Sequence, residues 1–174
     1  MSEADDKILR HLNAFSKQAM QALMAARLKA GQRGAVAIEL GDLLLGLIVA
    51  DQGLWENLFP DMRKGDRLLD SAPYTPFFST VVASKTLSGI EALLPYSEPI
   101  GHTVELPLSH EVQLAFDEAE RIQKTFLQRQ IEPLHLLAAV LTQEGSQYVK
   151  LLLTEGITKE LVLRKLKASD QSGR

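Results

Sequence analysis

The chain contains no cysteine and few aromatic residues, and these absences exclude several classes of protein. Among its 174 residues there are no Cys, 1 Trp, 3 Tyr and 6 Phe. A chain without cysteine holds neither a disulfide framework nor a cysteine-ligated zinc site. The absence of cysteine fits a reducing compartment. The longest apolar run, residues 43–50, is too short to span a bilayer, and the acidic start at residues 2–6 is unlike a signal peptide. We therefore expect a cytoplasmic protein with no membrane-spanning segment.

The chain also lacks an excess of basic charge and the common catalytic motifs. The formal net charge is −3 and the pI is near 5.8, without the concentrated basic stripe that a nucleic-acid-binding surface needs. The G-x-x-x-x-G-K-[ST] phosphate loop, the H-E-x-x-H metal motif and the G-x-S-x-G nucleophile elbow do not occur. We therefore expect no nucleic-acid partner, no metal, no cofactor and no catalytic residues.

What the chain does have is an internal repeat. Residues 15–59 and 108–152 share one rhythm of apolar and polar positions without gaps, at an offset of 93 positions, as from 38 to 131. Such self-similarity predicts two related structural units and places a binding surface at or between them. The matched positions include Ala22 and Ala115, Ala26 and Ala119, Ile38-Glu39 and Ile131-Glu132, Leu43-Leu44 and Leu136-Leu137, and Trp55 and Tyr148.

Apolar residues recur at helical intervals in both halves. In the first half the spacing predicts helices over residues 16–29, 40–49, 54–59 and 62–69. In the second half Ser109, Ser146 and Thr158 are placed to cap helices, and Pro133 stands at a first helical position. We therefore expect one domain over residues 1–174, with a first repeat at about 13–70 and a second at about 108–168.

A long linker, residues 71–107, joins the two predicted repeats. It is rich in proline, and we expect at most an extra helix turn or two at residues 88–94 and a short extended piece at 102–106. Connections of this length within a compact domain are uncommon and are often functional or mobile. The linker is interpreted as a structural strap, with a binding loop as the alternative.

The second repeat carries a family resemblance. The run Ile131-Glu132-Pro133-Leu134-His135-Leu136, followed in register by Glu155-Gly156-Ile157, resembles the amino-terminal repeat of Clp unfoldases. The resemblance implies an all-α fold in which two four-helix repeats pack with pseudo-twofold symmetry. It also implies a docking domain for substrates or adaptors. The chain lacks the phosphate loop of the family's ATPase motor.

The resemblance also suggests a site. In some relatives an acidic residue of a T-E-H motif lines a phosphoarginine pocket, and that position falls on Gly41 and Leu134 here. The nearest acids, Glu39 and Glu132, are candidates to bind a cationic group, or they only complement the positive helix ends. Asp42 and His135 follow them, as an acid and base pair or as structural residues. Two further leucines either line an apolar groove or pack between the units: Leu45 and Leu153.

We therefore expect a non-catalytic module that binds a peptide, an unfolded segment or a protein partner. Candidate partners include a Clp ATPase or peptidase. One alternative is a regulatory or adaptor protein that associates with itself or with a Clp ATPase. A minor alternative is an enzyme or small-molecule binder of unrecognised type. The oligomeric state does not follow from the sequence.

Overall fold

The computed structural model describes residues 10–54 and 75–172, and this part of the chain is helical, as predicted. The helices predicted at 54–59 and 62–69, and Trp55 with them, lie largely or wholly outside the described residues. Within the described part, β-pairing is limited to two isolated bridges. The named helices are α2 (Lys17–Gln32), α3 (Leu40–Gln52), α4 (Thr80–Leu93), α5 (His110–Thr125), α6 (Pro133–Val140), α7 (Gln147–Thr154) and α8 (Lys159–Ser172).

Helices α5 to α8 begin where the sequence predicts helix starts. The hydroxyl of Ser109 accepts a hydrogen bond from the Val112 amide at 3.3 Å, and Thr158 caps α8 in the same way. Ser146 caps α7, and Pro133 opens α6 at a position where no intrahelical N–H bond is needed. These local signals place the helix starts before any tertiary contact is considered.

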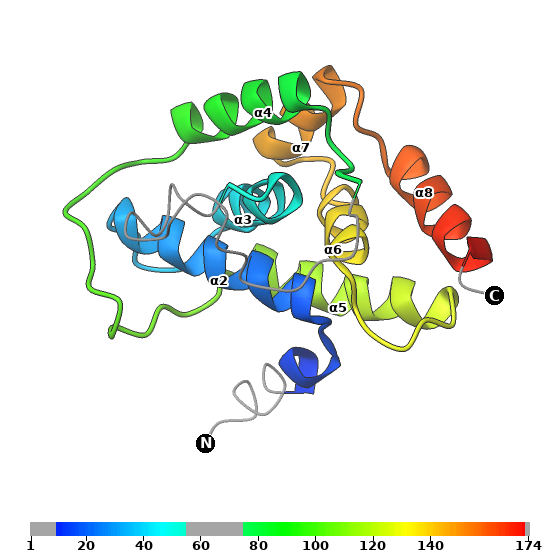
Figure 1. The fold of residues 1–174 in the computed structure, drawn as a ribbon. Coiled ribbons are helices and arrows are strands. Elements are labelled where there is room, and N and C mark those ends of the chain that lie inside the picture. Colours follow the sequence, from blue (N-terminus) through cyan, green and yellow to red (C-terminus); the bar gives the residue numbers. More distant parts are fainter. Residues whose placement is uncertain (1–9, 55–74, 173–174) are drawn as a thin grey trace.

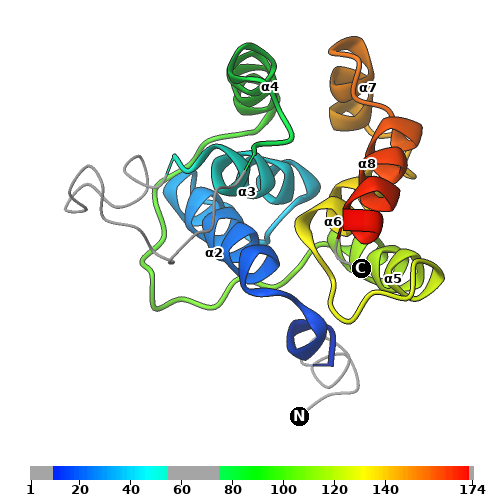
Figure 2. The same ribbon diagram turned by 45° about the vertical axis from the view of Figure 1, so that its right-hand side comes forward.

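Helices α3 and α6 form the centre of the fold. Figures 1 and 2 show α3 between α2 and α4, and α6 between α5 and α7. The approach of α2 to α3 is close because α2 presents buried alanines and α3 presents Gly46. A Cβ atom at Gly46 would lie 2.6 Å from the Ala26 amide nitrogen, so only glycine fits there.

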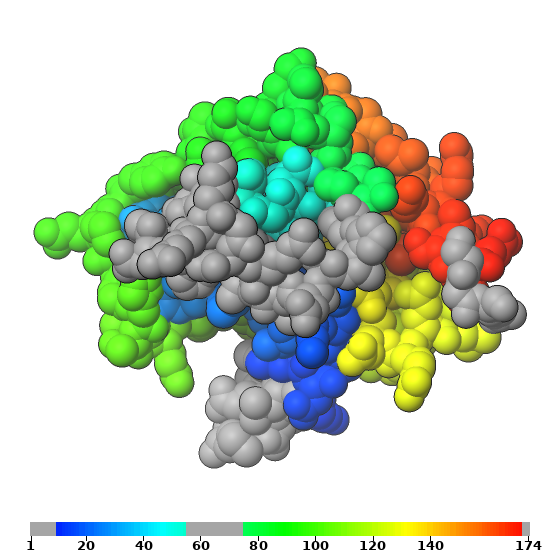
Figure 3. All heavy atoms as spheres, viewed as in Figure 1, coloured from blue at the N-terminus to red at the C-terminus, as the bar shows by residue number. Residues whose placement is uncertain are grey.

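The connecting segment differs from the prediction, since it contains a full helix. Instead of a turn or two at residues 88–94, α4 runs for 14 residues from Thr80 to Leu93, capped by Ser79. Its β-branched residues and Gly89 lower its intrinsic helix propensity, which explains the underestimate. Burial of Ala83, Thr86 and Ile90 stabilises it in the folded protein. Figure 3 shows α4 and α7 forming one continuous edge of the surface.

The segment that follows α4 is tied to the end of α2. The Ser97 amide donates to the Arg33 carbonyl at 2.7 Å, and the Ile100 amide donates to the Gly31 carbonyl at 2.8 Å. The extended piece expected at 102–106 is a turn, in which the Val104 amide bonds the Gly101 carbonyl. The side chain of Arg27 donates to the carbonyls of Gly101 and Val104 in this turn. This segment is therefore held against the end of α2, and we refer to it below as the strap.

Two bridges join the halves in an equivalent way. Phe15 pairs with Ile131 in parallel, and Leu108 pairs with Ile38 in parallel. The offset of 93 positions converts one pair into the other, from 15 to 108 and from 38 to 131. The hydrogen bonds agree, since the Ser16 amide donates to the Ile131 carbonyl at 3.0 Å and the Ser109 amide donates to the Ile38 carbonyl at 2.9 Å. The exchange of equivalent contacts is what a pseudo-twofold arrangement of two repeats requires.

We refer below to α2, α3 and α4 as the first unit and to α5, α6, α7 and α8 as the second unit. Helix α4 is placed in the first unit because it packs against α3, and α8 is placed in the second because it packs against α6. Helix α7 follows α6 along the chain and packs against α4, so it lies at the boundary between the units.

Candidate functional site

A groove lies between the two units, where the start of α3 meets the start of α5 and the loop before α7. Its volume is about 850 Å³. Three carboxylates line it, from Glu39, Glu111 and Glu144, and among the residues that the structure describes no lysine or arginine lines it. The remaining lining residues are Ala37, Leu40, Ser109, Gln143, Gly145, Ser146, Gln147 and Tyr148.

The first wall of the groove is built on a buried ion pair. Nε of Arg33 donates to Oδ1 of Asp42 at 2.8 Å, and Nη2 donates to Oδ2 at 2.7 Å, a bidentate geometry. The Arg33 side chain is 4% exposed and the Asp42 side chain is 0% exposed. The hydrogen bonding that Arg33 donates to Asp42 raises the pKa of Arg33, against the opposing effect of burial. Arg33 also donates to the Pro95 carbonyl at 3.2 Å, which ties the strap to α3.

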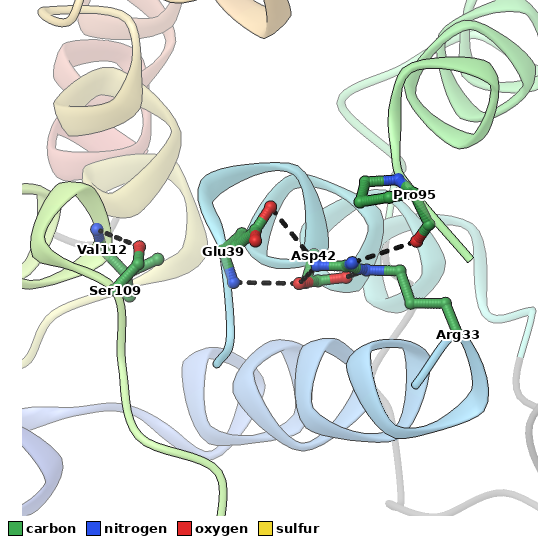
Figure 4. Close-up of polar contacts among 6 residues, drawn as sticks. All are labelled: Arg33, Glu39, Asp42, Pro95, Ser109 and Val112. Carbon is green, nitrogen blue, oxygen red and sulfur yellow. Dashed lines mark hydrogen bonds and ion pairs between the residues drawn. The ribbon is translucent and has the colours of Figure 1, made fainter. Parts of the chain in front are cut away.

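Glu39 stands at the edge of this ion pair and faces the groove. It is the N-cap of α3, and its amide donates to Oδ2 of Asp42 at 2.9 Å. Its side chain is 39% exposed, and its Oε2 lies 3.4 Å from Nη2 of Arg33. Figure 4 shows Glu39 between the Arg33–Asp42 pair and Ser109 at the start of α5. The carboxylate is therefore held in place by Arg33 and by the helix end while it stays accessible to solvent.

Gly41 is buried and has no room for a side chain. A Cβ atom there would lie 2.8 Å from Cζ of Tyr148 and 2.9 Å from Cδ2 of Leu94. The ring of Tyr148 is 8% exposed, and its burial raises the pKa of the phenol. The position where the resemblance places a pocket acid is therefore closed by Tyr148, a residue of the second unit.

The equivalent residues of the second unit are arranged differently. Glu132 is the half-buried N-cap of α6, and Leu134 packs partly buried against the main core. His135 is 0% exposed, and its Nδ1 accepts a hydrogen bond from the Glu132 amide at 2.8 Å. None of these three residues lines the groove.

The two candidate leucines do not form a common groove. Leu45 is 2% exposed and belongs to the main core, so its predicted role in an exposed groove is wrong. Most of α3 is buried, including every residue from Leu40 to Val49, and the helix lies between α2 and α4, which leaves no solvent-facing side at Leu45. Leu153 is 46% exposed on α7. Of the eight candidate residues, Glu39 is the one that lines the groove.

Glu111 and Glu144 were not among the predicted site residues. Glu111 follows the cap Ser109 in the first turn of α5, and Glu144 precedes the Gly145 break before α7. In the sequence both positions are typical of acids near helix starts, so nothing local distinguishes them. Within residues 10–54 and 75–172, no group of three or more His, Cys, Asp or Glu residues is suited to hold a metal ion. Over the same residues, no helix has the length and apolar character needed to cross a membrane.

Comparisons with known proteins agree with the fold. The sequence matches no protein-family model and no curated protein. Among solved structures, the N-terminal domain of the chaperone ClpD from Arabidopsis thaliana superposes with a TM-score of 0.60 at 17% identity, covering 90% of this chain and 97% of that chain. The N-terminal domain of Hsp104 from Candida albicans gives 0.57 at 13% identity, covering 87% and 88%.

A third structure, from preliminary structural investigations of a malarial protein secretion system, gives a TM-score of 0.66 at 15% identity. It covers 91% of this chain and 95% of its own. At such identities the likeness concerns the fold. The chain has the all-helical fold of the N-terminal domains of Clp chaperones.

Proposed function

We propose that this protein is a non-catalytic docking module that holds an extended, cationic segment of a protein partner in the groove between its units. The observation that carries this proposal is the charge of the groove. Glu39, Glu111 and Glu144 contribute three carboxylates, and the described residues of the lining include no lysine or arginine. Arg33 contacts Glu39 from behind the wall of the groove, but it is also paired with Asp42. An acidic groove beside low-dielectric walls attracts and orients basic ligands.

The shape of the groove favours an extended segment over a compact ligand. The groove is bounded by short pieces of chain from three places, residues 37–40, 109–111 and 143–148. Leu40 and Tyr148 supply apolar wall in the same groove as the carboxylates, which suits a segment that carries both apolar and basic side chains. Exposed ion pairs contribute only about 0.2–1 kcal/mol each, so we expect modest affinity that falls as salt is added.

Glu132 provides a comparison within the same molecule. It caps α6 as Glu39 caps α3, but it does not line the groove. We therefore assign the docking role to Glu39 and a helix-capping role to Glu132. Substitution of Glu39 by glutamine should weaken binding, and the same substitution of Glu132 should not.

Two observations support a non-catalytic role. Asp42 is held by both nitrogens of the Arg33 fork, and His135 is buried with its Nδ1 occupied by a backbone amide. A general acid or base must reach the proton that it transfers. Neither residue lines the groove, so Asp42 and His135 do not form an acid and base pair there.

The test is a binding assay with a labelled short peptide that alternates leucine and arginine. Fluorescence anisotropy would compare the native protein with a Glu111→Gln/Glu144→Gln variant and a matched control, Glu105→Gln/Glu160→Gln, which alters exposed carboxylates outside the groove. We expect the groove variant to bind about 2- to 30-fold more weakly, from two lost charge contacts. Equal loss in both variants would show a non-specific charge effect and would contradict the proposal.

A second peptide, with glutamate in place of arginine, tests the charge of the ligand. We expect no saturable binding of this peptide at low salt. Binding that is equally tight for both peptides would mean that the groove does not select cationic segments. Capture of a Clp ATPase or peptidase, or self-association, would instead identify the protein as a regulator or adaptor.

A further inference from the structure

One buried ionisable group plays no part in the proposed docking site. His135 lies in the first turn of α6 and is 0% exposed. Its Nδ1 accepts the Glu132 amide at 2.8 Å, so the neutral ring carries its hydrogen on Nε2. Nε2 is buried and has no hydrogen-bond partner among the residues that the structure describes. The ring therefore has one nitrogen in use as an acceptor and one in apolar surroundings.

The helices packed against α6 present few ionisable groups to this ring. The buried residues of α2 and α5 are all non-ionisable, and so are the buried Val162 and Leu166 of α8. Helix α3 contains two buried carboxylates, Asp42 and Asp51, and each is engaged elsewhere. Asp42 is paired with Arg33, and Asp51 accepts the amides of residues 77 and 78. Helix α6 itself contains no acid, and the nearest acid along the chain is Glu132, the cap residue just before it.

Protonation of the neutral ring must occur at Nδ1, because Nε2 already carries a hydrogen. Nδ1 carries the lone pair that a proton would bind, and that lone pair already accepts a hydrogen bond from the Glu132 amide. Protonation therefore removes the hydrogen bond that caps α6 and leaves a cation in an apolar core. We infer that His135 is an acid-sensitive switch, by which protonation loosens the start of α6 and with it the second unit. This inference does not depend on the docking function.

The first unit lacks this device, because its equivalent residues differ. Asp42 stands 93 positions before His135 and accepts the Glu39 amide with a carboxylate that Arg33 holds. The position equivalent to Arg33 is Phe126, which is partly buried against the main core. An ion pair in one unit is therefore matched by an apolar residue and a neutral imidazole in the other. We expect mild acid to act on the second unit before the first.

The direction of the effect follows from proton binding. Burial lowers the pKa of His135 to about 4, whereas an unfolded histidine has a pKa near 6.5. Between these two values the unfolded chain binds a proton that the folded chain does not, so stability falls as the pH drops from 6.5 to 4. From pH 7 to pH 5 this one group should raise the unfolding equilibrium constant about 20-fold.

The first experiment compares urea unfolding at pH 7 and pH 5 for the native protein, His135→Asn and His102→Asn. Asparagine offers an uncharged side-chain oxygen to the Glu132 amide, and His102 is an exposed control. All three proteins contain the same carboxylates, so the contribution of these groups to the pH dependence is the same in each. We expect the native protein and His102→Asn to lose stability together, and His135→Asn to lose about 20-fold less in its unfolding constant. The same loss in His135→Asn as in the native protein would overturn the inference.

The second experiment needs no variant and stands even where His135→Asn fails to fold. Nitrogen-15 NMR of the imidazole rings at pH 7 should show His135 as the Nε2–H form. Amide hydrogen exchange, corrected for its intrinsic pH dependence, should show residues 133–140 losing protection at pH 5 before residues 40–52. A ring that carries its hydrogen on Nδ1, or exchange that rises equally in α3 and α6, would refute the switch.

Discussion

Asp42 and His135 make the same hydrogen bond from equivalent places in the two units. Oδ2 of Asp42 accepts the Glu39 amide at 2.9 Å, and Nδ1 of His135 accepts the Glu132 amide at 2.8 Å. Each acceptor is fully buried in the first turn of its helix. The amide of the cap residue is thus bonded by a charged carboxylate in one unit and by a neutral imidazole in the other. We therefore expect the two units to respond differently to mutation and to acid.

The buried pair of Arg33 and Asp42 should be a main determinant of stability. Replacing Arg33 with methionine leaves the Asp42 carboxylate buried without its partner, because both of its oxygens are bonded to that guanidinium. We expect the free energy of unfolding to fall by about 3–5 kcal/mol in urea titrations.

The double variant Arg33→Met/Asp42→Asn provides the control, since it removes both charges and keeps an acceptor for the Glu39 amide. It should recover a large part of the lost stability. If the double variant is as unstable as the sum of the two single variants, the pair is not coupled as the geometry requires.

Gly41 should not tolerate even a methyl group. A Cβ atom there would meet Tyr148 and Leu94 at less than 3 Å, and both belong to packed parts of the fold. We expect Gly41→Ala to lower the free energy of unfolding by about 1–3 kcal/mol. Gly101→Ala is the matched control, because nothing lies within 4 Å of its added Cβ. Equal stability of the two variants would show that Tyr148 moves aside without cost.

Leu127 adopts a left-handed backbone with a φ of 52°, and the equivalent position in the first unit is Gly34, with a φ of 72°. Non-glycine residues cost roughly 1–2 kcal/mol in this region, and the Leu127 side chain is 85% exposed, so it gains little from burial. We expect Leu127→Gly to raise the melting temperature and to stabilise the fold by about 1 kcal/mol.

The reciprocal change supplies the comparison. Gly34→Ala would place a Cβ against the Glu98 carbonyl as well as strain the backbone, so it should destabilise the fold by more than about 1 kcal/mol. Loss of stability in Leu127→Gly would indicate that the leucine makes a favourable contact that outweighs its backbone strain.

Asp51 should anchor the start of the α4 region to the end of α3. Its carboxylate accepts the Phe77 amide at 2.8 Å and the Phe78 amide at 3.0 Å. Asp51→Ala leaves these amides without that acceptor, and we expect about 1.5–3 kcal/mol of destabilisation with faster amide exchange at residues 77–83. Asp51→Asn retains one acceptor oxygen, so its free energy of unfolding should lie between those of the native protein and Asp51→Ala. No change in exchange at these amides would contradict the anchoring role.

Much of the fold follows from local sequence. The caps Ser109, Ser146 and Thr158 and the proline at 133 stand at helix starts, because a cap acts on amides only two or three residues away. The offset of 93 positions likewise predicted which residues are equivalent, and the paired bridges agree with it. These features depend on spacing along the chain, which the sequence states directly.

The tertiary structure decided what depends on distant contacts. Helix α4 has weak local signals, and it is stabilised by burial of Ala83 and Ile90. The sequence has more leucines near Leu45 than one helical stripe needs, but α3 is buried at every residue from Leu40 to Val49. The groove forms because residues 37–40, 109–111 and 143–148 converge, and no spacing rule relates Glu39 to Glu144. The sequence alone therefore determined most of the described helices and the offset between equivalent residues. The candidate site arises from packing between residues about 100 positions apart, which follows the global fold and not local periodicity.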